Sequence, residues 1–577
     1  MRKIASLILA FALITAMCLS ALPVRTYAFD LTPEQADRYF WRAYAAGLVP
    51  EGLWGDRGAT RRAEFAAFAV AFYEVVTGRE IAGRMAFNDT DDVNVQKMGY
   101  LGVVTGDGNG NFSPNALVSR EQVAIMLARL AHAVGITLPT QTPTFADTSA
   151  ISPWAIDTVG QMQAVGLMEP LSGNRFSPTT VFPRQHSVIA MLWLYEIAQY
   201  GTRRIEVWFS HQDITNERLA QMVAGGEIPA NVTHLWLGGN PISDISPLAG
   251  LTNLVTLYLW SNTIIDVDPL RNLTNLRRLY LSSNSIRDIS PLDGLINLTQ
   301  LHLSGNPISN IAPLGNLTNL TELSLMSNNF VSMQPLSNLT NLTILSMGDN
   351  PQFNGDITPI GRLINLTELS LVCTWSDKIT DYTAIGNLVN LENLFLVNAS
   401  QLTDISFLSR LANLTSLNIH AADINDFTPL GQLESLTHLR LQGSEIDDAA
   451  LQQIGRLTNL TSLWFWNSYI SDISPLGNLT NLENLGLSEN RIVDIFPLVR
   501  LANLQWLDLS NNQVSDISAL ARMSSLTGIS LNNNQITDIS VLFGMTGMSH
   551  IELIGNPLSV YQLAELRNAL PNTNIGY

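Results

Sequence analysis

The sequence predicts a chain of two parts: an amino-terminal region built from long repeats, and a solenoid of short stacked repeats covering about two thirds of the 577 residues. Three observations predict it: an apolar leader, a long repeat in residues 29–201, and an asparagine that returns every 22 residues. A fixed period of this length is typical of solenoid rungs. The interval is kept by Asn240, Asn262, Asn284, Asn306, Asn328 and Asn350, then by Asn490, Asn512, Asn534 and Asn556.

Each asparagine closes the phrase Leu-x-Leu-x-x-Asn and is followed by apolar residues at regular offsets, which makes seven inward positions per rung. One rung cannot bury this surface alone, so the rungs must stack. A carboxamide both donates and accepts hydrogen bonds. We therefore expect each asparagine to satisfy backbone groups of two adjacent rungs. Counting from Asn240, the inward positions are Ile242, Ile245, Leu248, Leu251, Leu254, Leu257 and Leu259.

Five middle rungs depart from this pattern, and the spacings there become 24, 25, 23, 22 and 24 residues. The asparagine position is taken by Thr374, Ala399, Ala422, Ser444 and Ser468. We expect a looser or bulged solenoid between about residues 348 and 468, with faster deuterium exchange than in the flanking rungs.

The phrase resembles the leucine-rich repeat family, in its short internalin-like bacterial form, over about residues 231–558. The resemblance implies a curved solenoid of about 15 rungs, with a parallel β-sheet on the concave face and 3₁₀ or extended turns on the convex face. Phrases such as Ser246-Pro247-Leu248 agree, because serine can cap a short helical turn and proline suits its first position. We expect residues 202–230, with a strand at 205–209 and a helix at 216–224, to cap the first rung. Residues 559–577, with a helix at 560–570, should cap the last.

The leader at residues 1–28 is typical of an export signal: Arg2 and Lys3 precede an apolar run, and small residues before Phe29 offer a cleavage site. The alternative is an uncleaved membrane anchor. Cleavage removes three basic residues and no acid, so the net charge changes from −18 to −21. Such a protein is a poor ligand for nucleic acid or an anionic membrane. Only Cys373 would remain after cleavage, so we expect no internal disulfide.

The amino-terminal repeat combines a Phe-x-Asp phrase, a helical stretch, a glycine turn and an arginine that opens a helix. It is clear at Phe87 to Asp89 and again at Phe145 to Asp147, with a weaker first copy. These units resemble the S-layer homology domain, with copies at about 29–83, 84–141 and 142–201. The family implies an all-α pseudo-trimer that binds a secondary cell-wall polysaccharide.

Several side chains occupy positions that the family uses for wall-polymer binding. A guanidinium at a helix start can grip a pyruvate carboxylate through two hydrogen bonds. Two departures reduce the match, because Leu31 replaces the aspartate of the first copy and the second copy has no tryptophan in its helix. The alternative is that each arginine caps or pairs locally. The residues are Arg62, Asp89, Arg120, Asp147, Trp154 and Arg184.

The glycine turn at residues 106–115 alternates Asp107, Asn109 and Asn111, as a calcium loop does. Such a loop requires glycine at its sixth position and glutamate at its twelfth, where this chain has Phe112 and Val118. We therefore interpret it as a structural turn and expect no metal site.

Outward side chains of the repeat strands should line the concave face, at two, four and six residues before each asparagine position. Exposed aromatic and arginine side chains are typical of binding surfaces. The alternative is that some rings stack on one another for stability. The candidate partner-binding residues are Trp236, Tyr258, Trp260, Tyr280 and His302, then Phe395, His420, His438, Arg440, Trp464, Trp466 and Trp506.

No motif of catalysis stands out, so we expect no catalytic residue and no cofactor. His420 and His438 should lie too far apart in register to share a metal. The sequence favours a secreted protein attached to the cell wall or S-layer of a Gram-positive-type bacterium. Its solenoid would be displayed for adhesion to a protein or glycan. A structural component of the surface layer is the alternative, and an uncharacterised enzyme is less favoured.

Overall fold

The computed structural model describes residues 33–53, 58–168, 170–171, 173–200, 205–372, 378–420, 423–442 and 446–577. The predicted signal, Cys373, and the rung positions Thr374, Ala422 and Ser444 lie outside the described residues. Contacts divide the chain into two compact units. The first holds residues up to Glu206 together with 225–233, and the second holds 207–224 and 234–577. Within the described residues, no helix combines the length and the apolar character needed to cross a membrane.

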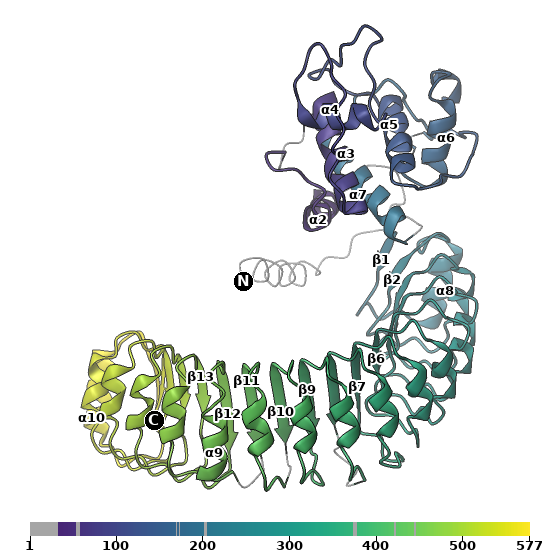
Figure 1. Cartoon of the computed structure of the whole chain (residues 1–577). Coiled ribbons are helices and arrows are strands. Elements are labelled where there is room, and N and C mark those ends of the chain that lie inside the picture. Colours follow the sequence, from purple (N-terminus) through teal and green to yellow (C-terminus); the bar gives the residue numbers. More distant parts are fainter. Residues whose placement is uncertain are drawn as a thin grey trace. The chain divides into compact units, whose positions relative to one another are not determined.

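The amino-terminal unit is helical (Figure 1). Its core gathers side chains from every part of the unit, and the largest fully buried ones include Phe65, Phe68, Phe72 and Trp193. The α-helices are α2 (Pro33–Ala45), α3 (Arg62–Thr77), α4 (Val93–Tyr100), α5 (Arg120–Ala133), α6 (Ile156–Ala164) and α7 (Arg184–Tyr200), with a 3₁₀ turn η1 (Thr148–Ala150) before α6.

Three short segments, each just before an arginine-headed helix, join in a ring of backbone hydrogen bonds. The N–H of Thr60 donates to the Phe182 carbonyl at 2.9 Å, and the N–H of Phe182 donates to Val118 at 2.8 Å. The N–H of Val118 then donates to Thr60 at 3.1 Å, which closes the ring. The three helices α3, α5 and α7 therefore start from one shared centre. The all-α pseudo-trimer of three copies stays a prediction.

The second unit is a solenoid whose strands stand side by side with short helical turns beside them (Figure 1). The strands are β1 (Glu206–Trp208), β2 (His234–Trp236), β3 (Thr256–Tyr258), β4 (Arg278–Tyr280), β5 (Gln300–His302), β6 (Glu322–Ser324), β7 (Ile344–Gly348), β8 (Glu368–Val372), β9 (Asn393–Val397), β10 (Ser416–His420), β11 (His438–Gln442), β12 (Ser462–Trp466), β13 (Asn484–Gly486), β14 (Trp506–Asp508), β15 (Gly528–Ser530), β16 (His550–Glu552) and β17 (Asn574–Gly576).

Turns of 3₁₀ helix connect most rungs, and one connection is a short α-helix, α9 (Asp448–Ile454). The 3₁₀ turns are η2 (Ser246–Gly250), η3 (Asp268–Leu270), η4 (Ser290–Leu292), η5 (Ala312–Asn316), η6 (Gln334–Asn338), η7 (Thr358–Arg362), η8 (Thr383–Asn387), η9 (Ser406–Arg410), η10 (Thr428–Gln432), η11 (Ser474–Asn478), η12 (Phe496–Arg500), η13 (Ser518–Arg522) and η14 (Ser540–Gly544).

From β2 to β17, each strand pairs in parallel with the next. The central leucines are in register, as Leu235 with Leu257 and Leu257 with Leu279, and all three are fully buried. Because strand side chains alternate, the residues on either side of each leucine point to the opposite face. The predicted solenoid with a parallel sheet is therefore confirmed.

The asparagine side chains hold neighbouring rungs together in the predicted way. The Asn306 amide donates to the carbonyls of Leu303 in its own rung and Leu281 in the preceding rung, both at 3.0 Å. Its oxygen accepts the N–H of Ile286 in the preceding rung, also at 3.0 Å. Asn306 is 2% exposed, so these backbone groups have no water to replace it. The amide therefore completes the hydrogen bonding of two rungs at once.

The middle rungs differ from their neighbours in strand length. Strands β7 to β12 have five residues, whereas β2 to β6 and β13 to β16 have three. In β8 to β12 the ladder is thus longer where the corner asparagine is missing, and β7, which precedes Asn350, is lengthened as well. At the edge of this region, the buried side-chain oxygen of Asn350 has no partner among the described residues. Faster deuterium exchange here stays a prediction.

The expectation that serine caps the convex turns is wrong. Ser246 lies inside η2, and the turn has no side-chain cap. Its N–H instead donates to the carboxylate of Asp244, two residues earlier, at 2.8 Å. The same Asx turn precedes η13 at Asp516 and η14 at Asp538. Aspartate suits this place because its short side chain reaches the N–H two residues on. The proline at the start of η2 is as predicted.

A second asparagine ladder on the surface was not expected. Asn319 donates to the carbonyl of Ile296 in the preceding rung at 2.8 Å, and Asn341 donates to Thr318 at 2.9 Å. These asparagines belong to the Leu-Thr-Asn-Leu phrases, and both are exposed. They add one hydrogen bond per rung where water can compete.

Both ends of the solenoid carry capping elements where the sequence predicts them. At the start, β1 pairs with β2, and a helix α8 (Asn216–Ala224) packs against η2. Asn240 ties this cap to the first rung, because its oxygen accepts the N–H groups of Gln212 and Ile214. At the end, α10 (Val560–Ala569) packs against η14, and β17 pairs with β16.

We predict that Asn306→Ala destabilises the solenoid much more than Asn319→Ala. The first change leaves an N–H and carbonyls buried without partners, which costs on the order of 3 kcal/mol in the free energy of unfolding. The second removes one exposed hydrogen bond and should cost about 1 kcal/mol or less. Urea unfolding of the full chain followed by circular dichroism measures both values. Equal losses would contradict the role of the buried ladder.

We also predict an acid-labile contribution from the convex turns. Hydrogen bonds from Ser246, Ser518 and Ser540 hold the pKa values of Asp244, Asp516 and Asp538 below their usual range. A lowered folded pKa stabilises the fold above the unfolded pKa of about 4, and this stabilisation is lost as pH falls through the folded pKa.

Replacing these three aspartates together with asparagine should flatten the fall in unfolding free energy below about pH 4. Asn310 already makes the same turn without a charge, since its oxygen accepts the N–H of Ala312 at 3.0 Å. The measurement is urea unfolding at a series of pH values. An unchanged acid slope in the triple variant would refute the assignment.

Candidate binding surfaces

In the amino-terminal unit, two of the arginines that head a helix, Arg62 and Arg120, each contact a turn that follows a Phe-x-Asp phrase. The Nε of Arg62 donates to the Phe112 carbonyl at 2.8 Å, and its guanidinium lies 4.5 Å from the centre of the Phe112 ring. Asp89 holds the same turn by accepting the N–H groups of Phe112 and Ser113, both at 2.7 Å. Ser113 has a φ of 61°, so the carboxylate stabilises a left-handed corner. Arginine and aspartate thus support one turn between them.

The next junction repeats this geometry. The Nε of Arg120 donates to the Phe176 carbonyl at 2.7 Å, and Asp147 accepts the N–H groups of Phe176 and Ser177. Arg120 is only 2% exposed. Burial lowers the pKa of its guanidinium to about 10, although the charge of Asp147 opposes that shift. Arg120 therefore stays charged at neutral pH while its Nε is occupied by the protein itself.

Arg184 differs, because its guanidinium pairs with the carboxylate of Glu64 through both Nε and Nη2. Trp154 is 53% exposed, so its ring is accessible. Asp89 is exposed as well. The hydrogen bonds from Phe112 and Ser113 lower the pKa of its carboxyl group. Burial raises the pKa of Asp147, but the hydrogen bonds from Phe176 and Ser177 outweigh it and lower the pKa overall.

The turn around Asp107 has the structural bonding expected of it. The Asp107 carboxylate accepts the N–H groups of Asn109 and Asn111 and the side-chain amide of Asn111. Its oxygens are thus engaged within the loop. Among the described residues, no group of three or more His, Cys, Asp or Glu side chains could hold a metal ion.

On the sheet face of the solenoid, the first predicted aromatic group forms one continuous stack. Trp236 lies between Trp208 of the cap, at 3.6 Å, and Tyr258, at 5.2 Å, with planes within 12° in both pairs. Tyr258 and Tyr280 follow at 4.2 Å. The stack continues through His302, 4.6 Å from Tyr280, and the Nε2 of His302 lies 2.9 Å from a carboxylate oxygen of Glu322.

The stack covers much of its own surface. Trp236 is only 8% exposed, and burial followed by the neighbouring Tyr258 raises the pKa of Tyr280. Trp260 stands apart from the stack and contacts the imidazole of His211, 5.1 Å away and edge-on. At this end of the solenoid the rings therefore stack on one another, which is the alternative to partner binding considered from the sequence.

The second group is more open. The Arg440 guanidinium covers Trp466, 4.4 Å from the ring centre. Trp464 and Trp506 lie two strands apart, each opposite a glycine of the next strand: Gly486 and Gly528. A Cβ at either glycine would collide with the indole beside it. Both tryptophans therefore lie flat across the sheet, seated on a strand that has no side chain at that point.

The other predicted concave residues are dispersed. His420 pairs with Gln442, and His438 pairs with Ser416, which confirms the four-residue offset between the two histidines. Burial, and then the charge of Arg440, lowers the pKa of His420. His438 is exposed, and Phe395 is half-buried on β9. These side chains do not form one cluster with the tryptophans.

Three participating rings were not selected from the sequence. Trp208 opens the aromatic stack from the cap, His211 covers Trp260, and His550 lies 5.7 Å from Trp506 with planes 24° apart. His550 stands six residues before Asn556, so the same spacing rule could have found it. Trp208 and His211 precede the first asparagine, where the rule has no reference point.

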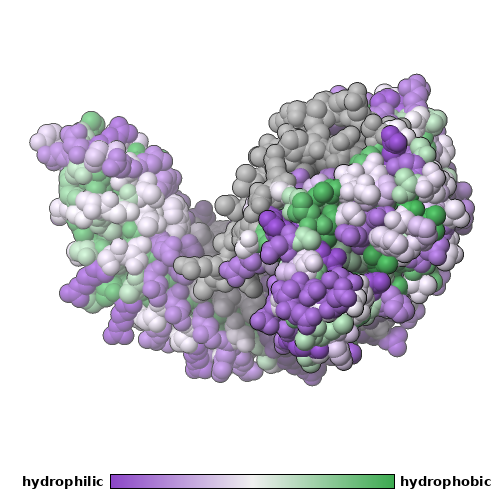
Figure 2. Space-filling view, turned by 90° about the horizontal axis from the view of Figure 1, so that it is seen from above, coloured by the Kyte–Doolittle hydropathy of each residue, from purple (hydrophilic) through white to green (hydrophobic). Residues whose placement is uncertain are grey.

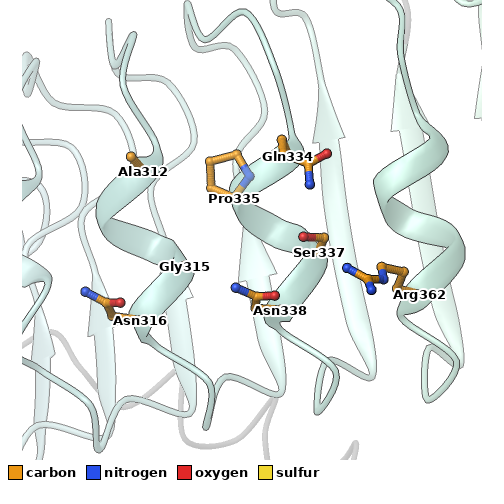
Figure 3. Close-up of a pocket in the computed structure, with 8 residues that line it drawn as sticks. All are labelled: Ala312, Gly315, Asn316, Gln334, Pro335, Ser337, Asn338 and Arg362. Carbon is orange, nitrogen blue, oxygen red and sulfur yellow. The ribbon is translucent and has the colours of Figure 1, made fainter.

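A shallow depression lies between three neighbouring turns on the convex side (Figure 3). Ala312, Gly315 and Asn316 come from η5, while η7 contributes Arg362. The rest of the lining comes from η6, and Figure 3 shows Asn316 and Asn338 at the same edge of their turns. It is an open furrow between repeats rather than a built pocket. The surface visible in Figure 2 mixes purple hydrophilic areas with smaller green patches, so binding faces have to be argued from individual side chains.

Comparison with protein families identifies both repeats. Leucine-rich repeats match residues 230–272, 274–316, 296–339, 458–500 and 502–561, and an S-layer homology domain matches residues 94–124. The family resemblances drawn from the sequence are therefore confirmed in these segments. The matched S-layer segment spans α4, the glycine turn and the start of α5. The first and third copies stay predictions.

Similar proteins include a leucine-rich-repeat protein from Leptospira interrogans, 25% identical over 64% of this chain and 95% of that one, with a TM-score of 0.54. An internalin from Listeria monocytogenes is 31% identical over 62% of this chain and 94% of that one, with a TM-score of 0.46. A Bacillus endoglucanase is 34% identical over 104 residues, which are 17% of this chain and 11% of the endoglucanase. The chain thus spans about a ninth of that curated relative.

We predict that Arg120→Ala destabilises the amino-terminal unit, whereas Trp154→Ala does not. The first change removes a buried charged donor from the Phe176 carbonyl and should cost about 3 kcal/mol in unfolding free energy. The second truncates an exposed side chain and should change that free energy by less than about 0.5 kcal/mol. Thermal and urea unfolding of the full chain separate the two variants. The assignment fails if Trp154→Ala is the more destabilising change.

Proposed function

We propose that this chain is a cell-surface protein whose amino-terminal unit anchors it to a wall polysaccharide while its solenoid binds a partner. The observation that carries the proposal is the union, in one chain, of an S-layer homology segment with a leucine-rich solenoid. The first family implies attachment at the cell surface, and the second implies interaction. We keep the boundaries 29–201 for the anchor and 231–558 for the displayed repeats, after removal of the export signal at 1–28.

The wall polymer would bind where the copies meet. Trp154 supplies an accessible ring, and Arg184, already paired with Glu64, could exchange that partner for an acidic sugar substituent. Arg62 and Arg120 hold the turns of the adjacent copies, so their first effect on binding would be to keep the groove in shape. Trp154 and Arg184 are therefore the residues we place in contact with the polymer.

The matched families and folds are non-catalytic. The resemblance to an endoglucanase covers 17% of this chain, so it does not favour an enzyme. The half-open aromatic side chains of the sheet face support adhesion to a protein or glycan, because aromatic side chains contribute strongly to interface energetics. A purely structural role in the surface layer would require the protein to assemble with itself.

We expect the full chain without its signal to sediment with purified walls of a bacterium that carries pyruvylated wall polysaccharide. Trp154→Ala should reduce the bound fraction several-fold, because it removes the open ring without weakening the fold. Tyr561→Ala is the control, since Tyr561 is 70% exposed and lies in the carboxyl-terminal cap.

Undiminished sedimentation of the Trp154→Ala variant would count against the assigned groove. If neither the parent protein nor any variant sediments with the walls, the anchoring role is wrong. Ordered sheets formed by the purified protein alone, seen by electron microscopy, would instead favour the structural role.

A further inference from the structure

The carboxyl-terminal third of the sheet face carries two flat tryptophan surfaces that the repeat pattern alone does not explain. Trp464 on β12 and Trp506 on β14 are half-buried, and each lies over a glycine of the neighbouring strand. Each indole thus has one face against the backbone, and each side chain keeps part of its surface exposed. His550 lies beside the ring of Trp506, 5.7 Å away with planes 24° apart. Glycine at these two positions removes the side chains that would otherwise push the rings upright.

The two surfaces are spaced for an extended ligand. They are two strands apart across the sheet and two residues apart along it, because Trp464 is in register with Asp508 through Gly486, and Trp506 precedes Asp508 by two residues. With strands about 4.8 Å apart and about 3.3 Å per residue, their Cα atoms are separated by about 12 Å. One small ring cannot cover both surfaces, whereas a chain of ring-shaped units can.

The charge of this surface identifies the class of chain. Outward positions of β12 to β16 carry the carboxylates of Asp508 and Glu552 and no lysine or arginine. On the preceding strand, β11, Arg440 is in register with Trp464, and its guanidinium covers the ring of Trp466. A single-stranded nucleic acid also stacks on aromatic rings, but it requires a positively charged groove. An anionic polymer on this surface would lie beside the carboxylates of Asp508 and Glu552, which would repel it there.

Polar groups beside the rings complete the match with a neutral sugar. Asp508 uses one carboxylate oxygen to accept the N–H of Ser510, and its other oxygen has no partner among the described residues. Glu552, near His550, has a pKa lowered by the hydrogen bond from Ser530 and then by His550, so it is ionised at neutral pH. Carboxylates accept hydrogen bonds from hydroxyl groups. The C–H groups on the flat side of a sugar ring are attracted to the negative face of an indole.

We propose that Trp464 and Trp506 form a binding site for a neutral, extended polysaccharide of pyranose rings. Asp508 lies between the two surfaces and accepts hydroxyl groups of the bound chain. This deepens the proposed function by naming the ligand class of the solenoid. It also separates two sugar specificities in one chain: an acidic wall polymer for the arginine-bearing anchor and a neutral polymer for the solenoid.

The test uses the full chain without its signal and two soluble probes, cellohexaose and N-acetylchitohexaose, with tryptophan fluorescence and calorimetry as readouts. At least one probe should bind saturably. Trp464→Ala and Trp506→Ala should each weaken that binding by about 5- to 100-fold, the usual effect of losing one ring-stacking contact. Gly486→Leu should weaken it as well, although both tryptophans are retained, because the new side chain displaces Trp464 from its seat.

Phe496→Ala is the matched control. Phe496 is a 59% exposed aromatic side chain in η12, the turn between β13 and β14, so its loss should leave sugar binding unchanged. Unfolding curves of all variants exclude misfolding as the cause of any loss. Polygalacturonate, an anionic polymer of similar rings, should bind at least tenfold more weakly than the better neutral probe.

Three results would overturn the proposal: neither neutral probe binds, binding survives in the Trp464→Ala/Trp506→Ala double variant, or polygalacturonate binds as well as the neutral probes. These failures are distinguishable from failure of the anchoring role. Wall sedimentation depends on the amino-terminal unit, so it would persist if only the sugar site were wrong.

Discussion

The solenoid depends on one repeated interaction, the hydrogen bonding of a buried carboxamide to the backbone of two rungs. Asn306 shows the pattern, with its own Leu303 carbonyl, the Leu281 carbonyl of the rung before it, and the Ile286 N–H. These groups lie at a corner where the chain leaves the sheet and cannot use the strand ladder. An unpaired buried backbone group costs about as much as a lost hydrogen bond. Leucine burial drives the rungs together, but the asparagine makes each corner compatible with that burial.

The same constraint explains where the solenoid departs from regularity. In the middle rungs, where the asparagine is replaced, the strands extend to five residues and the sheet takes over part of the bonding. Longer strands present a further outward side chain on the sheet, as Trp466 does on β12. Relaxing the corner thus widens the outward face at Trp466, whereas Trp506 lies on β14, a regular strand of three residues.

The two units use arginine and aspartate in a comparable structural way. In the amino-terminal unit, Asp89 and Asp147 hold the N–H groups of a turn, and in the solenoid Asp244 does the same before a 3₁₀ helix. An arginine at a helix start donates a hydrogen bond to a backbone carbonyl of a distant turn, as Arg120 does to Phe176. Arg120 is therefore buried, although its position suggested a ligand contact. Arginine is suited to binding an anion, and it is equally suited to donating hydrogen bonds to the backbone carbonyls of a neighbouring turn.

The period of 22 residues and the inward leucines were sufficient to predict the stacked parallel strands and the role of the asparagines. They also predicted which side chains face outward, since alternation along a strand is a local property. The sequence could not reveal that Trp236, Tyr258 and Tyr280 stack on one another, or that Trp464 and Trp506 lie flat on Gly486 and Gly528. Nor could it show that an Asx turn of aspartate, rather than a serine cap, precedes the convex turns. The repeat spacing is a property of each rung, so the sequence alone determines it. The orientation of a ring and its contacts depend on which residue of the neighbouring rung lies beside it, and only the stacked structure decides that.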